Sequence, residues 1–221
     1  MMGQGRTLKC RQNFIHSQSL SIIAEGLGVL SDMEHIDLND NRCGLSPWGE
    51  HSSEGIRTFS LNLTQTLHMR VVKLARNALE DEDIILIAQA VKMMPTMTTL
   101  DLSGNYCSLN GVASIRDLII SHSILGLDGD LGIRDLDLSC NPFGDDGVAL
   151  INEAVEKTDT LTSLKIAACR IQNEGMAALQ FSLAKNHTIT WLDVQSNEVK
   201  DIVEMRATAE AQANQRLKDL K

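Results

Sequence analysis

The apolar positions of the chain recur in a short phrase: an aliphatic residue, any residue, a second aliphatic residue, two further residues and then asparagine. Two aliphatic side chains spaced two residues apart point to one face of a short β-strand, and the residues beside them point to the other face. An asparagine that follows such a strand can bond through its side chain to backbone groups of a turn. The phrase therefore predicts a strand with one buried face that ends in a turn.

Seven copies of this phrase follow one another along the chain. They begin at Leu8, Ile36, Val72, Leu100, Leu136, Leu164 and Leu192, and successive starts are 28, 36, 28, 36, 28 and 28 residues apart. A base period of 28 residues is typical of a repeat architecture. Strands are expected near residues 8–10, 36–38, 72–74, 100–102, 136–138, 164–166 and 192–194. Two copies depart from the phrase, since Cys10 replaces an aliphatic residue and Cys169 replaces the asparagine.

Between the strands, apolar residues recur at helical spacing. The helices are expected to begin eleven residues after the first aliphatic residue of a phrase, at Ser19, Asp83, Gly111, Gly147 and Gly175. Each unit then consists of a strand, a turn, a helix and a second turn. No unit buries its apolar side alone, but stacked units bury a continuous core.

This pattern resembles the leucine-rich repeat family, in particular its long-repeat subtype typified by the ribonuclease inhibitor. The resemblance runs from about Gly5 to Asn197. It implies an α/β fold, a right-handed leucine-rich-repeat solenoid or horseshoe with a parallel β-sheet on the concave face and helices on the convex face. In such a stack the asparagines of the phrases form a structural ladder along one edge: Asn13, Asn41, Asn77, Asn105, Asn141 and Asn197.

The chain divides into a solenoid at residues 1–198 and a C-terminal amphipathic helix at residues 199–221. The helix is predicted because Ile202, Met205, Ala209, Ala213, Leu217 and Leu220 recur at helical spacing. We expect it to cap the last repeat, since a terminal repeat needs a polar outer face. The first repeat begins by Leu8 with few residues to cap it. Its open edge is expected to meet another protein or a second copy, or to continue a longer solenoid.

Two repeats are eight residues longer than the others. The register places one insertion between strand and helix, within residues 42–55, and the other after a helix, within residues 121–132. They are expected on opposite rims. Trp48 lies in the first loop and is either an exposed interaction anchor or folded back over neighbouring helices. In the second loop Leu125, Leu127 and Leu131 are expected to pack back, with Asp128 and Asp130 outside as a plain acidic turn.

The strand positions that face away from the helices form the candidate partner-binding surface. Nothing in the packing of the repeats is expected to demand their identity. We expect Asp101, Asp135 and Asp137 to converge into a negative patch that favours a basic partner. Trp191 is expected to be covered by the end of the chain or by a partner. The candidate contact residues on this concave face are His35, Asp37, Lys73, Asp101, Asp135, Asp137, Lys165, Trp191 and Asp193, and Trp48 is the candidate on the rim.

Composition and charge limit the partners. The chain has 20 basic and 29 acidic residues and a formal net charge of −9, which argues against nucleic acid or an anionic membrane as the main partner. The longest apolar run, Ile84 to Ala88, is far shorter than the ~20 residues that span a bilayer. The first ten residues lack the apolar segment of a secretory signal. Five cysteines without a CxxC pair favour reduced thiols, so the sequence predicts a cytoplasmic protein.

Catalytic chemistry is not indicated by any motif. The sequence contains no HExxH motif, no Cys/His metal spacing, and no GxGxxG or GxxxxGK[ST] loop. We therefore expect no catalytic residue, no metal and no cofactor. The sequence predicts a non-enzymatic scaffold that binds another protein through the concave sheet and the rim loops. The family resemblance implies two alternatives: a GTPase-activating protein resembling the Ran activator, and a structural subunit of a cytoskeletal or ciliary assembly.

Overall fold

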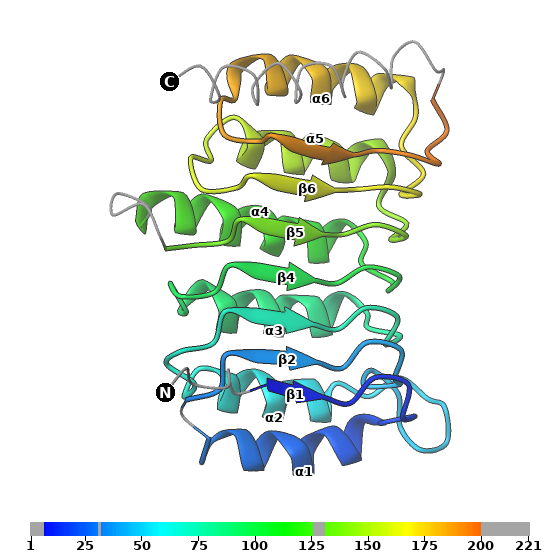
Figure 1. The fold of residues 1–221 in the computed structure, drawn as a ribbon. Helices are drawn as coiled ribbons and strands as arrows, with labels where there is room; N and C mark the ends of the chain where they lie inside the picture. The colour runs from blue at the N-terminus through cyan, green and yellow to red at the C-terminus, as the bar shows by residue number, and fades with distance from the viewer. Residues whose placement is uncertain (1–6, 31, 126–130, 200–221) are drawn as a thin grey trace.

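Strands and helices alternate along the chain. The computed structural model describes residues 7–30, 32–125 and 131–199, which contain seven strands and six helices (Figure 1). The strands are Thr7–Lys9 (β1), His35–Asp37 (β2), Val71–Lys73 (β3), Thr99–Asp101 (β4), Asp135–Asp137 (β5), Ser163–Lys165 (β6) and Trp191–Asp193 (β7). The helices are Ser17–Leu27 (α1), Glu54–Leu63 (α2), Asp81–Lys92 (α3), Leu109–Leu125 (α4), Gly144–Val155 (α5) and Asn173–Lys185 (α6).

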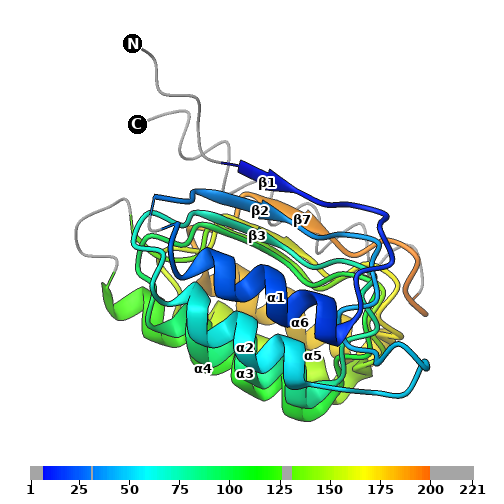
Figure 2. The same cartoon turned by 90° about the horizontal axis from the view of Figure 1, so that it is seen from below.

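The strands form one parallel sheet in chain order from β1 to β7. Neighbouring strands pair in the same register, so that the first aliphatic residues of the phrases lie side by side, as Leu8 beside Ile36 and Val72 beside Leu100. All six helices cover one face of this sheet (Figure 2). We call the opposite face, which carries no helix, the concave face. This arrangement is the α/β solenoid that the sequence predicts.

The elements begin slightly earlier than predicted. Each strand starts and ends one residue before its expected range, because the residue ahead of the first aliphatic already pairs, as Thr7 does with His35. Helix α3 begins at Asp81 rather than Asp83. The reason is a capping box, in which the Asp83 carboxylate accepts a hydrogen bond from the backbone N–H of Glu80 at 3.0 Å. Asp83 therefore lies within the first turn.

The core is an aliphatic layer between the sheet and the helices. Val72 and Leu100 of the sheet and Ile84 of α3 are fully buried. Burial of each such side chain contributes about 1.5–3 kcal/mol. At the β1 end of the sheet, Leu8 and Cys10 are only partly buried, so the first repeat is less covered than the repeats that follow it.

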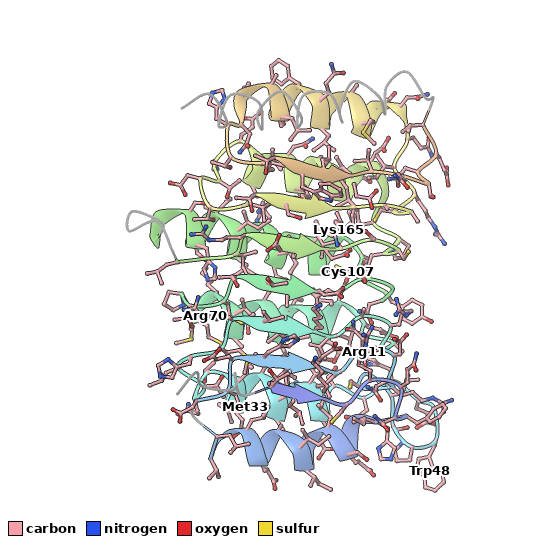
Figure 3. The ribbon with its side chains drawn as sticks, in the orientation of Figure 1. Arg11, Met33, Trp48, Arg70, Cys107 and Lys165 are labelled. Carbon is pink, nitrogen blue, oxygen red and sulfur yellow. The ribbon has the colours of Figure 1, made fainter. Side chains whose placement is uncertain are left out.

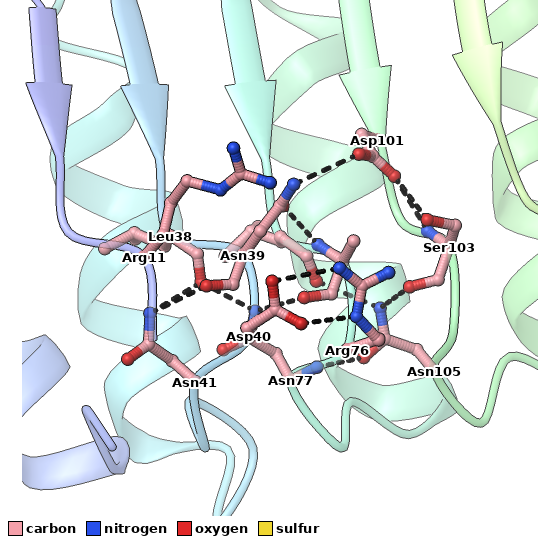
Figure 4. A network of polar contacts seen from close by, with 12 residues as sticks. Arg11, Leu38, Asn39, Asp40, Asn41, Arg76, Asn77, Asp101, Ser103 and Asn105 are labelled. Atoms are coloured by element: carbon pink, nitrogen blue, oxygen red, sulfur yellow. Dashed lines mark hydrogen bonds and ion pairs between the residues drawn. The ribbon is translucent and has the colours of Figure 1, made fainter. Parts of the chain in front are cut away.

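The phrase asparagines bond adjacent repeats to one another. The side-chain oxygen of Asn105 accepts hydrogen bonds from the backbone N–H groups of Asn77 and Leu79 at 2.9 and 3.1 Å. Its amide nitrogen donates to the carbonyls of Leu74 and Leu102 at 3.0 and 2.9 Å. Figure 4 shows part of this row of side chains. Each interior asparagine thus satisfies buried backbone groups of its own repeat and of the repeat before it.

The two longer repeats differ in how their extra residues are held. The loop between β2 and α2 and the C-terminal end of α4 lie at opposite ends of the strands, on opposite rims of the solenoid, in Figure 1. The buried His122 of α4 accepts a hydrogen bond from the backbone N–H of Ile133 and contacts the carbonyl oxygen of Val91, each at 3.1 Å. Leu131 is half-buried. The predictions for Leu125, Leu127, Asp128 and Asp130 lie outside the described side chains.

Candidate protein-binding site

The last residues of the seven strands form a charged column across the concave face. In strand order the column is Lys9, Asp37, Lys73, Asp101, Asp137, Lys165 and Asp193. Neighbouring strands lie about 4.8 Å apart, so each residue of the column has its neighbour's charge close by. The sign alternates at every step except one, where Asp101 of β4 pairs in register with Asp137 of β5.

A shallow depression of about 200 Å³ opens on the concave face at this step. The three aspartates that the sequence predicts to converge all line it. The predicted negative patch is in fact mixed in charge, because two lysines line the same depression and the Lys165 ammonium lies 3.3 Å from the Asp137 carboxylate. The full lining is Lys73, Thr99, Leu100, Asp101, Asp135, Leu136, Asp137, Ser163 and Lys165.

The aspartates of the column also have a structural role that the sequence analysis missed. The Asp101 carboxylate accepts hydrogen bonds from the backbone N–H and the hydroxyl of Ser103 at 3.1 and 2.7 Å (Figure 4). The carboxylates of Asp37, Asp137 and Asp193 likewise each accept a hydrogen bond from the backbone N–H two residues onward, those of Asn39, Ser139 and Gln195. Each aspartate thus closes the end of its strand. The packing does not demand an aspartate at this position, because lysine occupies it in β1, β3 and β6.

Asp135 differs from the other two aspartates of the depression. It lies at the start of β5, is exposed, and contacts only the Thr99 hydroxyl of the described chain, at 3.5 Å. The second carboxylate oxygen of Asp101, Oδ2, accepts a hydrogen bond from the Asn39 amide at 3.4 Å. The Oδ2 atom of Asp137 forms an ion pair with Lys165. Asp135 is therefore the carboxylate of the depression with the weakest internal contacts.

Two predicted contact residues near the β1 end are poorly placed for binding. Asp37 is 4% exposed and lies 3.5 Å from the Arg11 guanidinium, so the prediction that it is an open contact residue is wrong. His35 is half-buried, and burial together with the charges of Lys73 and Lys9 lowers its pKa. The neutral form of His35 is therefore favoured at neutral pH.

Both tryptophans are exposed, on different parts of the molecule. Trp48 is 87% exposed on the loop between β2 and α2, so the alternative that it folds back over neighbouring helices is wrong (Figure 3). Trp191 is 62% exposed on β7, where Asp193 lies beside Lys165. The segment predicted to cover Trp191 lies outside the described residues.

A polar cluster on the rim resembles a catalytic triad only in composition. The hydroxyl of Ser53 and the carboxylate of Asp83 lie 3.5 and 2.9 Å from the same ring nitrogen of His51, Nε2. A Ser-His-Asp relay needs the serine and the carboxylate on opposite ring nitrogens. The cluster therefore fastens the inserted loop to α3 and does not activate a nucleophile.

The buried thiols are equally unsuited to nucleophilic chemistry. Burial raises the pKa of Cys43 and of Cys169 to about 12, and burial likewise raises the pKa of Cys107. Such thiols stay protonated at neutral pH and are inert as nucleophiles. Within residues 7–30, 32–125 and 131–199, no group of three or more His, Cys, Asp or Glu side chains is arranged to hold a metal ion.

One pair of rim residues was missed by the sequence analysis. The Arg42 guanidinium lies over the Phe14 ring, 5.0 Å from its centroid. Each of the two residues directly follows a phrase asparagine, Asn13 or Asn41, in adjacent repeats. Their contact could have been predicted from this shared position, because equivalent positions of neighbouring repeats lie side by side in a solenoid.

Several solved structures resemble this fold at low sequence identity. Actin-binding site 2 of leiomodin-1 matches with a TM-score of 0.58 at 15% identity, over 76% of this chain and 94% of that one. The C-terminal domain of Caenorhabditis elegans tropomodulin matches with a TM-score of 0.52 at 13% identity, over 91% and 96%. A plant ice-binding protein matches with a TM-score of 0.52 at 16% identity, over 88% and 50%. These likenesses establish the fold alone.

A family model described as a leucine-rich repeat matches residues 133–151 and 159–179. A comparison with curated protein sequences finds no match. Together with the seven in-register repeats, the matched segments support a leucine-rich repeat protein. This supports a protein-interaction scaffold, while the ribonuclease-inhibitor-like subtype stays a prediction. In the described part of the chain no helix is long and apolar enough to cross a membrane.

Proposed function

We propose that this protein is a non-enzymatic scaffold that binds another protein on its concave face, with a basic side chain of the partner seated between Asp101, Asp135 and Asp137. The observation that carries the proposal is the single break in the charge column, where two carboxylates stand side by side. Like charges on directly opposed strand positions are destabilising. A partner's arginine or lysine would relieve that repulsion and gain charge-assisted hydrogen bonds.

Asp135 is the residue on which to test this proposal. Its carboxylate closes no strand end, so Asp135→Lys changes the charge of the depression without removing a structural bond of the Asp101 type. The partner would first be identified by affinity purification and mass spectrometry, and its affinity then measured by titration calorimetry. Loss of a desolvated charge pair costs about 2–5 kcal/mol, so we expect at least tenfold weaker binding.

The matched control is Asp146→Lys, which reverses an exposed carboxylate in the first turn of α5, on the helical face. It should leave affinity for the partner unchanged. Equal binding by wild type and Asp135→Lys would refute the concave depression as the site. Thermal unfolding of both variants shows whether the fold is intact.

We propose as a second candidate that the protein belongs to a cytoskeletal assembly in the cytoplasm. One observation favours it: the leiomodin-1 segment of similar fold is named as an actin-binding site. Co-sedimentation of the purified chain with actin filaments tests the idea. If the chain stays in the supernatant at filament concentrations well above its own, actin filaments are not its partner.

A further inference from the structure

We propose that the rim formed by Phe14, Arg42 and Trp48 is a second docking surface, which binds a short partner segment that carries one carboxylate beside an apolar side chain. This surface lies at one end of the solenoid, on the loops that follow β1 and β2, away from the depression at β4 and β5. The proposal does not depend on the concave-face site.

The inserted loop holds the backbone at Trp48 in a fixed position. Leu45 and His51 pair as an antiparallel bridge, and the N–H of Ser46 donates to the carbonyl of Glu50 at 2.7 Å. The turn closes through a bond from the N–H of Gly49 to the carbonyl of Ser46 at 3.0 Å. Gly49 has φ +86, a conformation that a side chain would strain. Trp48 thus lies at the tip of a well-defined hairpin.

The hairpin is in turn fastened to the repeats on both sides. Towards the first repeat, the N–H of Arg42 donates to the carbonyl of Ile15 at 2.9 Å, and the N–H of Ser17 donates to the carbonyl of Leu45 at 2.8 Å. Towards the third repeat, the N–H of Gly44 donates to the carbonyl of Asn77 at 3.0 Å. A rigid backbone loses little conformational entropy on binding, which favours affinity.

The three side chains of the rim have the chemistry of a binding hot spot. Trp48 is 87% exposed and Phe14 is 70% exposed, although neither side chain is required by the core. Tryptophan and arginine are enriched among the residues that dominate interface energies. An exposed indole on a well-held backbone is a natural anchor for an apolar side chain of a partner.

Arg42 sets the charge of the expected partner. Its guanidinium stacks on the Phe14 ring, which leaves the in-plane N–H donors free for a carboxylate. No carboxylate of the described chain forms an ion pair with Arg42, in contrast to Arg11 with Asp37 and Arg76 with Asp40. Its donors are therefore available to a partner.

The surroundings of Arg42 limit the number of carboxylates and the length of the partner segment. Glu50 on the hairpin and Glu54 at the start of α2 are both exposed, so the rim suits one carboxylate rather than an acidic stretch. Between Arg42 and Trp48 the chain makes a tight turn to Leu45 and then continues for three residues. The Cα atoms of Arg42 and Trp48 therefore lie at most roughly 17 Å apart. An extended segment of about five residues spans that distance.

The test is a selection of random heptapeptides on phage against the purified chain, followed by titration of the selected peptides. The affinities of the wild type and of every variant are measured by titration calorimetry. The emission of Trp48 is recorded separately in a Trp191→Phe background, where Trp48 is the remaining one of the chain's two tryptophans. We expect selected peptides to pair one Asp or Glu with an aliphatic or aromatic residue, and to shift the Trp48 emission to the blue. Trp48→Ala and Arg42→Gln should each weaken binding about tenfold or more.

Phe181→Ala is the matched control. Phe181 is a 63% exposed aromatic residue on α6 whose ring is also covered by a cation, the Lys185 ammonium, but Lys185 is already paired with Glu156 at 3.0 Å. This variant, and Asp135→Lys, should leave peptide affinity unchanged. Loss of peptide binding in Asp135→Lys would instead assign the peptides to the concave face and overturn the proposal.

Three further outcomes would overturn the proposal. The first is equal binding of the selected peptides to Trp48→Ala and wild type. The second is selection of peptides without a carboxylate. The third is concentration-dependent self-association in sedimentation velocity that Trp48→Ala abolishes, because the surface would then belong to a second copy of the chain.

Discussion

Replacement of Asn105 by alanine should destabilise the protein far more than the same change at Asn13. Asn105 is 3% exposed and accepts bonds from two buried N–H groups, those of Asn77 and Leu79. Alanine leaves both unsatisfied, at a cost of about 1–3 kcal/mol each. The expected loss is therefore about 4 kcal/mol, a large part of the ~5–15 kcal/mol that stabilises a typical protein.

Asn13 provides the matched control, because it occupies the same position in the first repeat. It is exposed, and its amide nitrogen donates one bond, to the carbonyl of Arg11 at 2.8 Å. Its replacement should cost less than about 1 kcal/mol. Urea unfolding followed by circular dichroism measures both losses, and the Asn105 variant should melt about 10 °C lower. A difference of less than 1 kcal/mol between the variants would refute the assigned role of the ladder.

Asn105→Cys extends this test. Cysteine occupies the ladder position in the sixth repeat, where the sulfur of Cys169 lies 3.4 Å from the carbonyl of Leu138 and 3.3 Å from that of Ala167. A thiol thus keeps part of the bonding, so Asn105→Cys should retain more stability than Asn105→Ala. Equal losses in the two variants would show that the sulfur contacts contribute nothing.

The two histidines that anchor the longer repeats should give opposite pH dependences of stability. Burial lowers the pKa of His51, but the bond and charge of Asp83 outweigh this and hold it above 6.5; its stabilisation is therefore complete below pH 6.5 and lost as the pH rises through the folded pKa. Burial lowers the pKa of His122, so stability should fall as the pH drops below 6.5. At the β1 edge of the sheet, where Leu8 is only partly buried, Leu8→Lys should abolish any self-association detected by light scattering.

The controls for the two pH predictions are variants that remove each imidazole. His51→Ala should flatten the fall in unfolding free energy above pH 6.5, and His122→Leu should flatten the fall below it. Unchanged slopes would contradict the assignments. A wild-type chain that is monomeric at all concentrations would contradict association through the edge of β1.

The strand positions were predictable from the sequence because the phrase repeats at fixed spacing. A two-residue alternation places Leu100 inside and Asp101 outside whatever the neighbouring repeats contain. The same periodicity does not report what the outward side chains do. The bond that the Ser103 hydroxyl donates to Asp101 depends on a local rotamer, and the approach of Lys165 to Asp137 depends on the path of a flexible side chain. These contacts were therefore missed.

The inserted loop was harder to predict than the repeats. Its eight extra residues follow no period, so the sequence did not decide whether Trp48 is exposed or folded back over neighbouring helices. The outcome depends on bonds between segments far apart in the sequence, such as that from the Gly55 N–H to the Ser17 hydroxyl at 2.7 Å. The contact of His51 with Asp83 joins the loop to α3 in the same way. Such pairings cannot be read from composition or local spacing.

The alternating charge column has a consequence for how a partner finds this protein. Alternating neighbours about 4.8 Å apart cancel one another when seen from further than the Debye length of about 8 Å at physiological ionic strength. Outside the step from Asp101 to Asp137, the concave face therefore exerts little electrostatic force on a distant partner, although the whole chain carries a net charge of −9. Recognition there takes place only after contact, by the match of individual charges, and its affinity should depend more on the dissociation rate than on the association rate.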